Sequence, residues 1–196
     1  MRVELNMSKW AVIGAALLSL AAAVVGAAAA PEKLSLASTA FHNHEHIPAA
    51  HVLNAYGCAG KNISPPLQWS GVPPGTKSFA LTVFDMDEHG TPSGWWHWVV
   101  YDIPANVTSL PAGAGIAHSS ALPHGAILGR VDSGNISYDG PCPAAGEPAH
   151  RYLFTLYALK VDKLPVPQEA SGAMVTWTAH ELTLAKATLI GLYGRP

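Results

Sequence analysis

Apolar positions after residue 31 fall into short runs separated by Pro and Gly turns, a pattern typical of β-strands. Three of these runs are long and contain no breaker: Lys77–Asp87, Trp95–Ile103 and Arg151–Val161. Their β-branched and aromatic residues favour strands, and Trp95–Ile103 is apolar on both alternating faces, as a central strand covered on both sides would be. A shorter strand is predicted at Leu67–Trp69.

Only residues 168–184 show a helical period, and that period is loose, with Met174, Trp177 and Leu182 as its apolar positions. Prolines interrupt most of the remaining chain. The pattern therefore predicts one antiparallel, mostly β domain over residues 30–196, with a short helix near the C-terminus.

The first thirty residues have a different pattern. Arg2 and Lys9 precede a run from Trp10 to Pro31 that carries no charge and ends in small residues. This order predicts a secretory signal peptide over residues 1–29. An uncleaved membrane anchor is the alternative, because the run is about long enough to span a bilayer. The Ala-rich second half favours cleavage, so we expect a secreted, periplasmic protein with no stable membrane span once the peptide is removed.

Composition narrows the function classes. Charged residues make up 12% of the chain, and 11 Lys+Arg against 13 Asp+Glu give a formal charge of −2, so we expect no nucleic-acid partner. Six Trp, six Tyr and the low charge exclude a disordered chain. Ten His nearly equal the Lys+Arg count, so almost half of the potential positive charge depends on pH.

Cys58 and Cys142 are the two cysteines of the chain. An even number in an exported protein predicts one disulfide. Two buried thiols are the alternative that the sequence leaves open.

Polar residues occur at the ends of the apolar runs. Asp85 and Asp87 are two positions apart and share one strand face, His97 lies within an apolar strand, and His150 and Tyr152 begin the third run. Taken alone, a histidine within a strand is typical of a core residue, and an aspartate that ends a strand is typical of a turn. Because buried polar groups need partners, we expect the carboxylates to lie near both imidazoles at one end of the sheet. Carboxylates would raise the imidazole pKa values, and a charged pair beside Tyr152 would form an anion pocket.

Several ordered motifs resemble one known family. They are Lys61-Asn62-Ile63-Ser64-Pro65-Pro66-Leu67-x-Trp69, Asp85-x-Asp87, Gly94-Trp95-Trp96-His97-Trp98-Val99-Val100-x-x-Ile103-Pro104, Tyr138-x-Gly140-Pro141-Cys142-Pro143, His150-Arg151-Tyr152 and Leu189-Ile190-Gly191-x-Tyr193-Gly194-Arg195. Together they resemble the phosphatidylethanolamine-binding protein family, most closely its bacterial Raf-kinase-inhibitor-like branch, over about residues 34–195.

The resemblance implies a β-sandwich with a large central antiparallel sheet, a smaller second sheet and a short helix near the C-terminus. It also implies a small pocket for phosphate, acetate or a phosphoryl head group. Matched position by position, the predicted ligand-binding residues are Asp85, Asp87, His97, Pro141, Cys142, Pro143, His150 and Tyr152. The chain departs from the family where Met86, Glu88 and His89 replace residues of its Asp-Pro-Asp-Ala-Pro motif.

We therefore expect a binding protein for a small anion or phosphoryl head group, with no enzymatic activity and no cofactor. One alternative is an inhibitor or regulator of an envelope protease or another envelope protein, which would act through the pocket region. Another is a hydrolase with His97 and His150 as acid and base, although the sequence offers no convincing nucleophile. The run His42-Asn43-His44-Glu45-His46 is typical of a solvated loop, and we predict no metal site.

Overall fold

A computed structural model describes Met1 and residues 33–196. Apart from Met1, the predicted signal peptide lies outside the described residues. The elements are β1 (Ser35–Ala37), β2 (Glu45–His46), the 3-10 helix η1 (Ala49–His51), β3 (Leu67–Ser70), β4 (Ser78–Asp85), β5 (Trp95–Pro104), β6 (Ser109–Leu110), β7 (Ile127–Leu128), β8 (His150–Leu159), α1 (Gly172–Leu182) and β9 (Thr183–Tyr193).

The strands form two sheets that pack face to face. The large sheet has the order β2-β9-β8-β4-β5-β7 and the small sheet the order β1-β3-β6. The predicted mostly β sandwich with one late helix is confirmed. The large sheet is antiparallel except at one edge, where the two residues of β2 pair parallel with β9.

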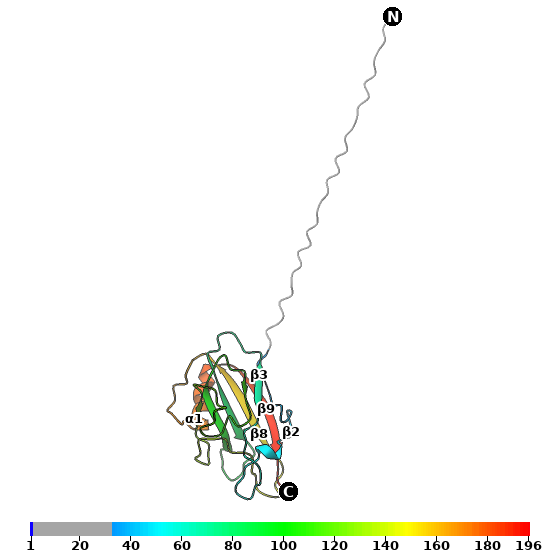
Figure 1. Ribbon diagram of the computed structural model, residues 1–196, viewed down its shortest axis with the longest axis vertical. Coiled ribbons are helices and arrows are strands. Elements are labelled where there is room, and N and C mark those ends of the chain that lie inside the picture. The colour runs from blue at the N-terminus through cyan, green and yellow to red at the C-terminus, as the bar shows by residue number, and fades with distance from the viewer. Residues whose placement is uncertain (2–32) are drawn as a thin grey trace.

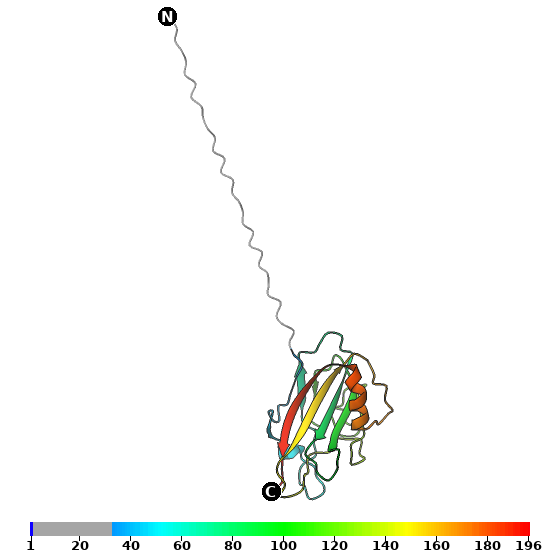
Figure 2. The same ribbon diagram turned by 180° about the vertical axis from the view of Figure 1, so that it is seen from behind.

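Both faces of the large sheet are covered (Figures 1 and 2). On one face, Phe79, Leu81 and Val83 of β4 pack in a core shared with Trp69 of the small sheet. On the other face, Ala80 belongs to a second core that α1 completes. Because side chains alternate along a strand, two covered faces require apolar residues at successive positions, as the sequence pattern predicts for the central strands.

The helix α1 has a different buried face from the one its loose period predicts. Ser171 caps it, accepting a hydrogen bond from the backbone N–H of Met174 at 3.3 Å. Val175 and Ala179 are buried, whereas Trp177 is 77% exposed. Small residues bring the helix close to the sheet: a Cβ on Gly172 would lie 2.4 Å from the ring of Trp96. Of the three apolar positions of the loose period, Met174 and Trp177 are therefore exposed and Leu182 packs against the core.

The outer edge of β5 is closed mainly by irregular chain. Besides the two-residue strand β7, the backbone N–H groups of Gly129, Asp132 and Asp139 donate to β5 carbonyls at 2.9–3.2 Å. The last of these bonds, from Asp139 to the carbonyl of His97, brings an acidic residue to the sheet end where β4 terminates.

The predicted disulfide between Cys58 and Cys142 is present, with an S–S distance of 2.06 Å. It joins the segment after η1 to the Gly140–Pro143 turn across 84 residues of sequence. In the chain-entropy model, closing a loop of that length contributes about 4 kcal/mol to stability. Among the described residues, no helix has the length and apolar character needed to cross a membrane.

Replacing Phe154 with Ala tests the main core. Phe154 is fully buried on β8 and its ring centroid lies 5.4 Å from that of Phe41. We expect Phe154→Ala to lower the free energy of unfolding by about 3–5 kcal/mol in denaturant titrations. The control Trp177→Ala removes an exposed aromatic ring and should change it by less than about 1 kcal/mol. Equal losses in the two variants would contradict this assignment of the core.

Candidate functional site

A cavity of about 550 Å³ opens at the end of the large sheet where β4 terminates. Strand register creates it, because Asp85, the last residue of β4, pairs with Trp95 on one side and Tyr152 on the other. The three side chains line the cavity together with His97. Gly94, with φ of +72°, starts β5 close to β4, where a Cβ would lie 2.3 Å from the ring of Phe84.

Of the residues predicted to bind a ligand, five line this cavity and three do not. Asp85, His97, Cys142, Pro143 and Tyr152 are in the lining, whereas Asp87, Pro141 and His150 are outside it. His150 nevertheless contacts the lining directly through Asp85, and Pro141 supports it through its carbonyl, which accepts a hydrogen bond from Leu53 at 3.2 Å.

Asp85 is the centre of the polar network. Its carboxylate is 1% exposed, and its Oδ2 accepts a hydrogen bond from His150 Nδ1 at 2.9 Å. The other oxygen accepts from the backbone N–H of Asp87 at 2.9 Å. Nε2 of His97 lies 4.0 Å from Oδ2. A buried carboxylate therefore lies between two imidazoles, as the sequence predicts.

The surroundings of His150 favour its imidazolium form. Nδ1 faces Asp85, and Nε2 lies 3.2 Å from Oε2 of Glu147. Carboxylates only accept hydrogen bonds, so an imidazole that serves both must carry two protons. Burial acts to lower the pKa of His150, but the hydrogen bonds and charges of Asp85 and Glu147 outweigh burial and raise it.

His97 is in the opposite state. Its Nδ1 donates to the carbonyl of Asp139 at 2.8 Å, which fixes the proton on that nitrogen. Burial lowers the pKa of His97, and the contacts with Asp139 and Asp85 oppose burial only in part. The neutral ring presents the lone pair of Nε2 at the cavity. The expectation of two charged imidazoles is therefore wrong for His97, because desolvation exceeds the attraction of the nearby carboxylates.

Tyr152 carries a buried hydroxyl that no other described residue satisfies. Its ring lies edge-on to His97, with centroids 5.1 Å apart, and stacks on His150 at 6.5 Å. Burial raises the pKa of Tyr152 far above its usual range, so the hydroxyl keeps its proton. The hydroxyl makes no well-formed hydrogen bond with another described residue, although the nearby Asp85 carboxylate also acts to raise its pKa.

Asp87 has a structural role beside the site. Its carboxylate accepts hydrogen bonds from Arg151 Nη2 at 2.6 Å and Nε at 2.8 Å, and from the Arg151 backbone N–H at 2.9 Å. These bonds lower the pKa of Asp87. The pair fastens the start of β8 to the chain that leaves β4, and so holds Asp85 and Tyr152 in register.

Asn62 ties the turn that carries Cys142 to the segment after η1. Its side-chain nitrogen donates to the carbonyl of Tyr138 at 3.2 Å, and its oxygen accepts from the backbone N–H of Gly140 at 2.7 Å. The amide of Asn62 thus satisfies the carbonyl of Tyr138 and the N–H of Gly140, and it fixes this wall of the cavity.

Three more acidic residues line the cavity, and periodicity in the sequence did not identify them. Glu88, Asp132 and Asp139 join Asp85, while in the described part of the chain no Lys or Arg reaches the lining. Asp139 accepts hydrogen bonds from Ser133 and Asn135, and Asp132 accepts one from the backbone N–H of Trp96 at 2.9 Å. With His97 neutral, the cavity is electronegative.

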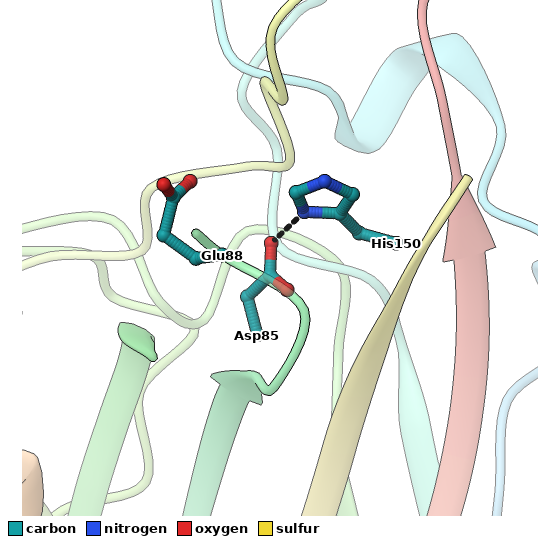
Figure 3. Close-up of side chains that lie close together, drawn as sticks. All are labelled: Asp85, Glu88 and His150. Carbon is teal, nitrogen blue, oxygen red and sulfur yellow. Dashed lines mark hydrogen bonds and ion pairs between the residues drawn. The ribbon is translucent and has the colours of Figure 1, made fainter. Parts of the chain in front are cut away.

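Asp85, Glu88 and His150 place ligand-type atoms within 4.8 Å of one another (Figure 3). Figure 3 shows His150 at the start of β8 directed at Asp85, with Glu88 on the loop beyond β4. A cation bound there would have to displace the proton that His150 Nδ1 donates to Asp85. Within residues 33–196 no second group of this kind is found, and His42, His44 and His46 do not form one.

The family model for the phosphatidylethanolamine-binding protein matches residues 37–194. The chain is 47% identical to the UPF0098 protein YbcL of Escherichia coli over 149 residues, which are 76% of this chain and 81% of YbcL. It is 43% identical to YbhB of the same organism, covering 82% of this chain and 99% of YbhB. The crystal structure of E. coli YbcL, described as a new member of the mammalian PEBP family, superposes with a TM-score of 0.81 over 84% of this chain and 100% of that one, at 43% identity.

This chain belongs to the phosphatidylethanolamine-binding protein family.

Removing the charge of Asp85 tests the network. In Asp85→Asn we expect the pKa of His150 to fall and the free energy of unfolding to drop by about 3 kcal/mol, because a buried cation loses its main partner. Since the pKa of His150 is raised above 6.5 in the folded state, the stabilisation is complete below pH 6.5 and is lost as pH rises through the folded value. Nitrogen NMR of the imidazole rings across pH, with denaturant unfolding, measures both.

Glu147→Gln is the matched control for that experiment. The side chain of Glu147 is 38% exposed, so its loss should lower the pKa of His150 less and destabilise the protein by less than about 1 kcal/mol. A His150 titration that is unchanged in Asp85→Asn would refute the ion pair.

Proposed function

We propose that this protein is a non-catalytic binding protein whose cavity holds a phosphoryl head group. The observation that carries the proposal is the buried hydroxyl of Tyr152, a donor with no well-formed hydrogen bond among the described residues, beside a neutral His97. A buried hydroxyl that goes unsatisfied is costly, so its retention at a cavity wall favours a ligand oxygen as its acceptor.

The charge of the cavity favours a head group that also carries an ammonium group. Asp85 is paired with His150, but the carboxylates of Glu88, Asp132 and Asp139 leave the lining negative, which weakens the binding of a simple anion and attracts a cation attached to it. The exposed aromatic ring of Tyr56 and the partly buried ring of Trp95 at the lining add cation–π attraction. A zwitterion such as phosphoethanolamine therefore suits the site better than inorganic phosphate at neutral pH.

The serine and threonine hydroxyls and the sulfur that line the cavity are engaged, which favours binding over covalent catalysis. Ser133 donates to Asp139, Thr91 donates to the carbonyl of Gly94, and Cys142 is in the disulfide. Tyr152 is held protonated by burial and is a poor nucleophile.

We also propose that the protein acts outside the cytoplasm. The apolar run that ends in small residues before Pro31 supports export, and a disulfide is typical of oxidising compartments. The ligand would then be a lipid head group or a soluble phosphoamine of the cell envelope. Detecting the protein in a periplasmic or culture-medium fraction, with residues 1–29 absent by mass spectrometry, would test this placement.

Tyr152→Phe separates binding from stability. Because the hydroxyl has no acceptor among the described residues, we expect its removal to leave the free energy of unfolding unchanged or slightly raised. Affinity for phosphoethanolamine, measured by calorimetry, should fall about tenfold, the value of one hydrogen bond.

Tyr101→Phe provides the reverse control. The hydroxyl of Tyr101 donates to the carbonyl of Pro167 at 3.2 Å, on the helix side of the sheet. Its removal should destabilise the protein by about 1 kcal/mol and leave the affinity unchanged. Undiminished affinity in Tyr152→Phe, or no binding of phosphoethanolamine at millimolar concentrations by the unaltered protein, would overturn the proposal.

Anion affinity should depend on pH through His97. The pKa of His97 lies below 6.5 in the free protein, and a bound anion raises it by favouring the imidazolium. Binding therefore takes up a proton, and affinity increases as pH falls from about 7.5 to about 5. Sulfate is the appropriate probe because its charge is constant over that range, and His97→Gln should weaken most of the dependence. A pH-independent sulfate affinity in the unaltered protein would contradict this mechanism.

A further inference from the structure

One wall of the cavity comes from outside the sheets. Leu53 and Tyr56 supply it from the segment after η1, and Cys142 and Pro143 continue it from the facing turn. Tyr56 lines the cavity although its side chain is 84% exposed, so it lies at the cavity mouth. Its backbone is in the left-handed region, with φ of +51°, a conformation that a tyrosine adopts only when its surroundings hold it there.

Few bonds hold this segment to the rest of the protein. Leu53 is tied by the hydrogen bond from its N–H to the carbonyl of Pro141. Beyond it, residues 54–59 are joined to other described parts of the chain by the Cys58–Cys142 disulfide with its sulfur contacts, and by Arg195 Nη1, which donates to the carbonyl of Tyr56 at 3.1 Å. The position of Tyr56 therefore depends on the disulfide and on one arginine.

The same arginine lies against both sulfur atoms. Nη1 of Arg195 is 3.4 Å from Sγ of Cys58 and 3.6 Å from Sγ of Cys142. Within residues 33–196 Arg195 takes part in no ion pair, so no carboxylate neutralises its charge. A cation beside a cysteine stabilises the thiolate, and a stabilised thiolate is a better leaving group in thiol–disulfide exchange.

The two sulfurs differ in access. Cys58 is 8% exposed, whereas Cys142 is partly exposed on the cavity wall. An external thiolate therefore reaches Sγ of Cys142 more readily than Sγ of Cys58. The sulfur that would leave, that of Cys58, is the one nearer the guanidinium.

We propose that Cys58–Cys142 is a thiol–disulfide exchange site that sets the affinity of the adjoining cavity. Its effect on affinity rests on the function proposed above. The reductant is a dithiol, either a small molecule or a protein with two neighbouring cysteines. One thiolate of the dithiol attacks Sγ of Cys142, the S–S bond breaks, and Cys58 leaves as a thiolate beside Arg195.

The second thiol of the reductant then closes its own disulfide and releases Cys142. Two electrons pass from the dithiol to the protein, and its two protons end on the two cysteines or in solvent. With the disulfide open, the hydrogen bond from the N–H of Gly60 to the carbonyl of Leu53 still closes the base of the loop, but only Arg195 and the weak Cys142 sulfur contacts hold residues 54–59 at the cavity. The wall is no longer preorganised, so ligand binding has to order it again and becomes weaker.

The test begins with protein that carries the intact disulfide, treated with dithiothreitol without denaturant. Alkylation and mass spectrometry follow the rate of reduction. We expect Arg195→Gln to react at least about threefold more slowly than the unaltered protein, and Arg195→Lys, which keeps the charge, to recover most of the rate. Arg130→Gln is the matched control, because Arg130 pairs with Glu169 away from the sulfurs and should react at the normal rate.

Two further measurements compare the oxidised and reduced forms of the unaltered protein. Hydrogen exchange of residues 54–59 should accelerate on reduction while that of β4 and β8 stays the same. Phosphoethanolamine affinity should fall by about fivefold or more. The double variant Cys58→Ser, Cys142→Ser should match the reduced form and be unaffected by dithiothreitol.

The exchange site is refuted if the disulfide reacts only after denaturant is added, or if Arg195→Gln reacts at the normal rate. It is equally refuted if residues 54–59 exchange alike in both redox forms, or if both forms bind phosphoethanolamine equally well. If the oxidised protein binds no phosphoethanolamine, the proposed function fails. The control of affinity fails with it, while the rate and hydrogen-exchange measurements still decide whether the disulfide is an exchange site.

Discussion

The buried carboxylate of Asp85 is the constraint on which the site depends. An ionised carboxylate that is 1% exposed is stable only if nearby groups replace the water it has lost. The protein supplies the imidazolium of His150 and a backbone N–H, and the second carboxylate of Glu147 keeps that imidazolium charged. Asp85 thus shares the imidazolium of His150 with Glu147. Its own charge does not overcome the effect of burial on His97, which stays neutral.

The division between the two imidazoles gives the cavity its chemistry. His150 has carboxylate partners on both nitrogens, so it balances the charge of Asp85 and leaves neither nitrogen free in this structure. His97 faces the cavity but is neutral, and Tyr152 adds a hydroxyl with an unused proton. In the binding mode proposed above, an anionic oxygen beside Tyr152 would favour protonation of His97, so ligand binding and protonation would be coupled. The sandwich holds these groups still, because β4 is packed on both of its faces.

Much of this fold could be predicted because the three central strands are long apolar runs. A strand that is covered on both faces of its sheet needs apolar residues at successive positions, and the sequence shows them. The strand β9 could not, since its first half contains Ala and Lys residues and lacks the long apolar run of the central strands. The site was predicted in part: spacing put Asp85 and Tyr152 at strand ends and His97 within a strand near them, and the family motifs indicated Cys142 and Pro143. The pattern of apolar and polar residues could not show that His97 is neutral, because the pKa of His97 depends on its burial. It also could not show that irregular loops bring Glu88 and Asp139 to the cavity.

The irregular chain that covers the outer edge of β5 affects whether a strand of another molecule can add to the large sheet. An exposed edge strand offers a row of unpaired backbone groups to which a strand of another molecule can add. Along β5, carbonyls near the cavity already accept from the backbone N–H groups of Asp132 and Asp139, two residues that line the cavity. The segment that forms the acidic wall of the cavity thereby also blocks this edge against sheet extension, so the same residues shape the cavity and protect the protein against aggregation.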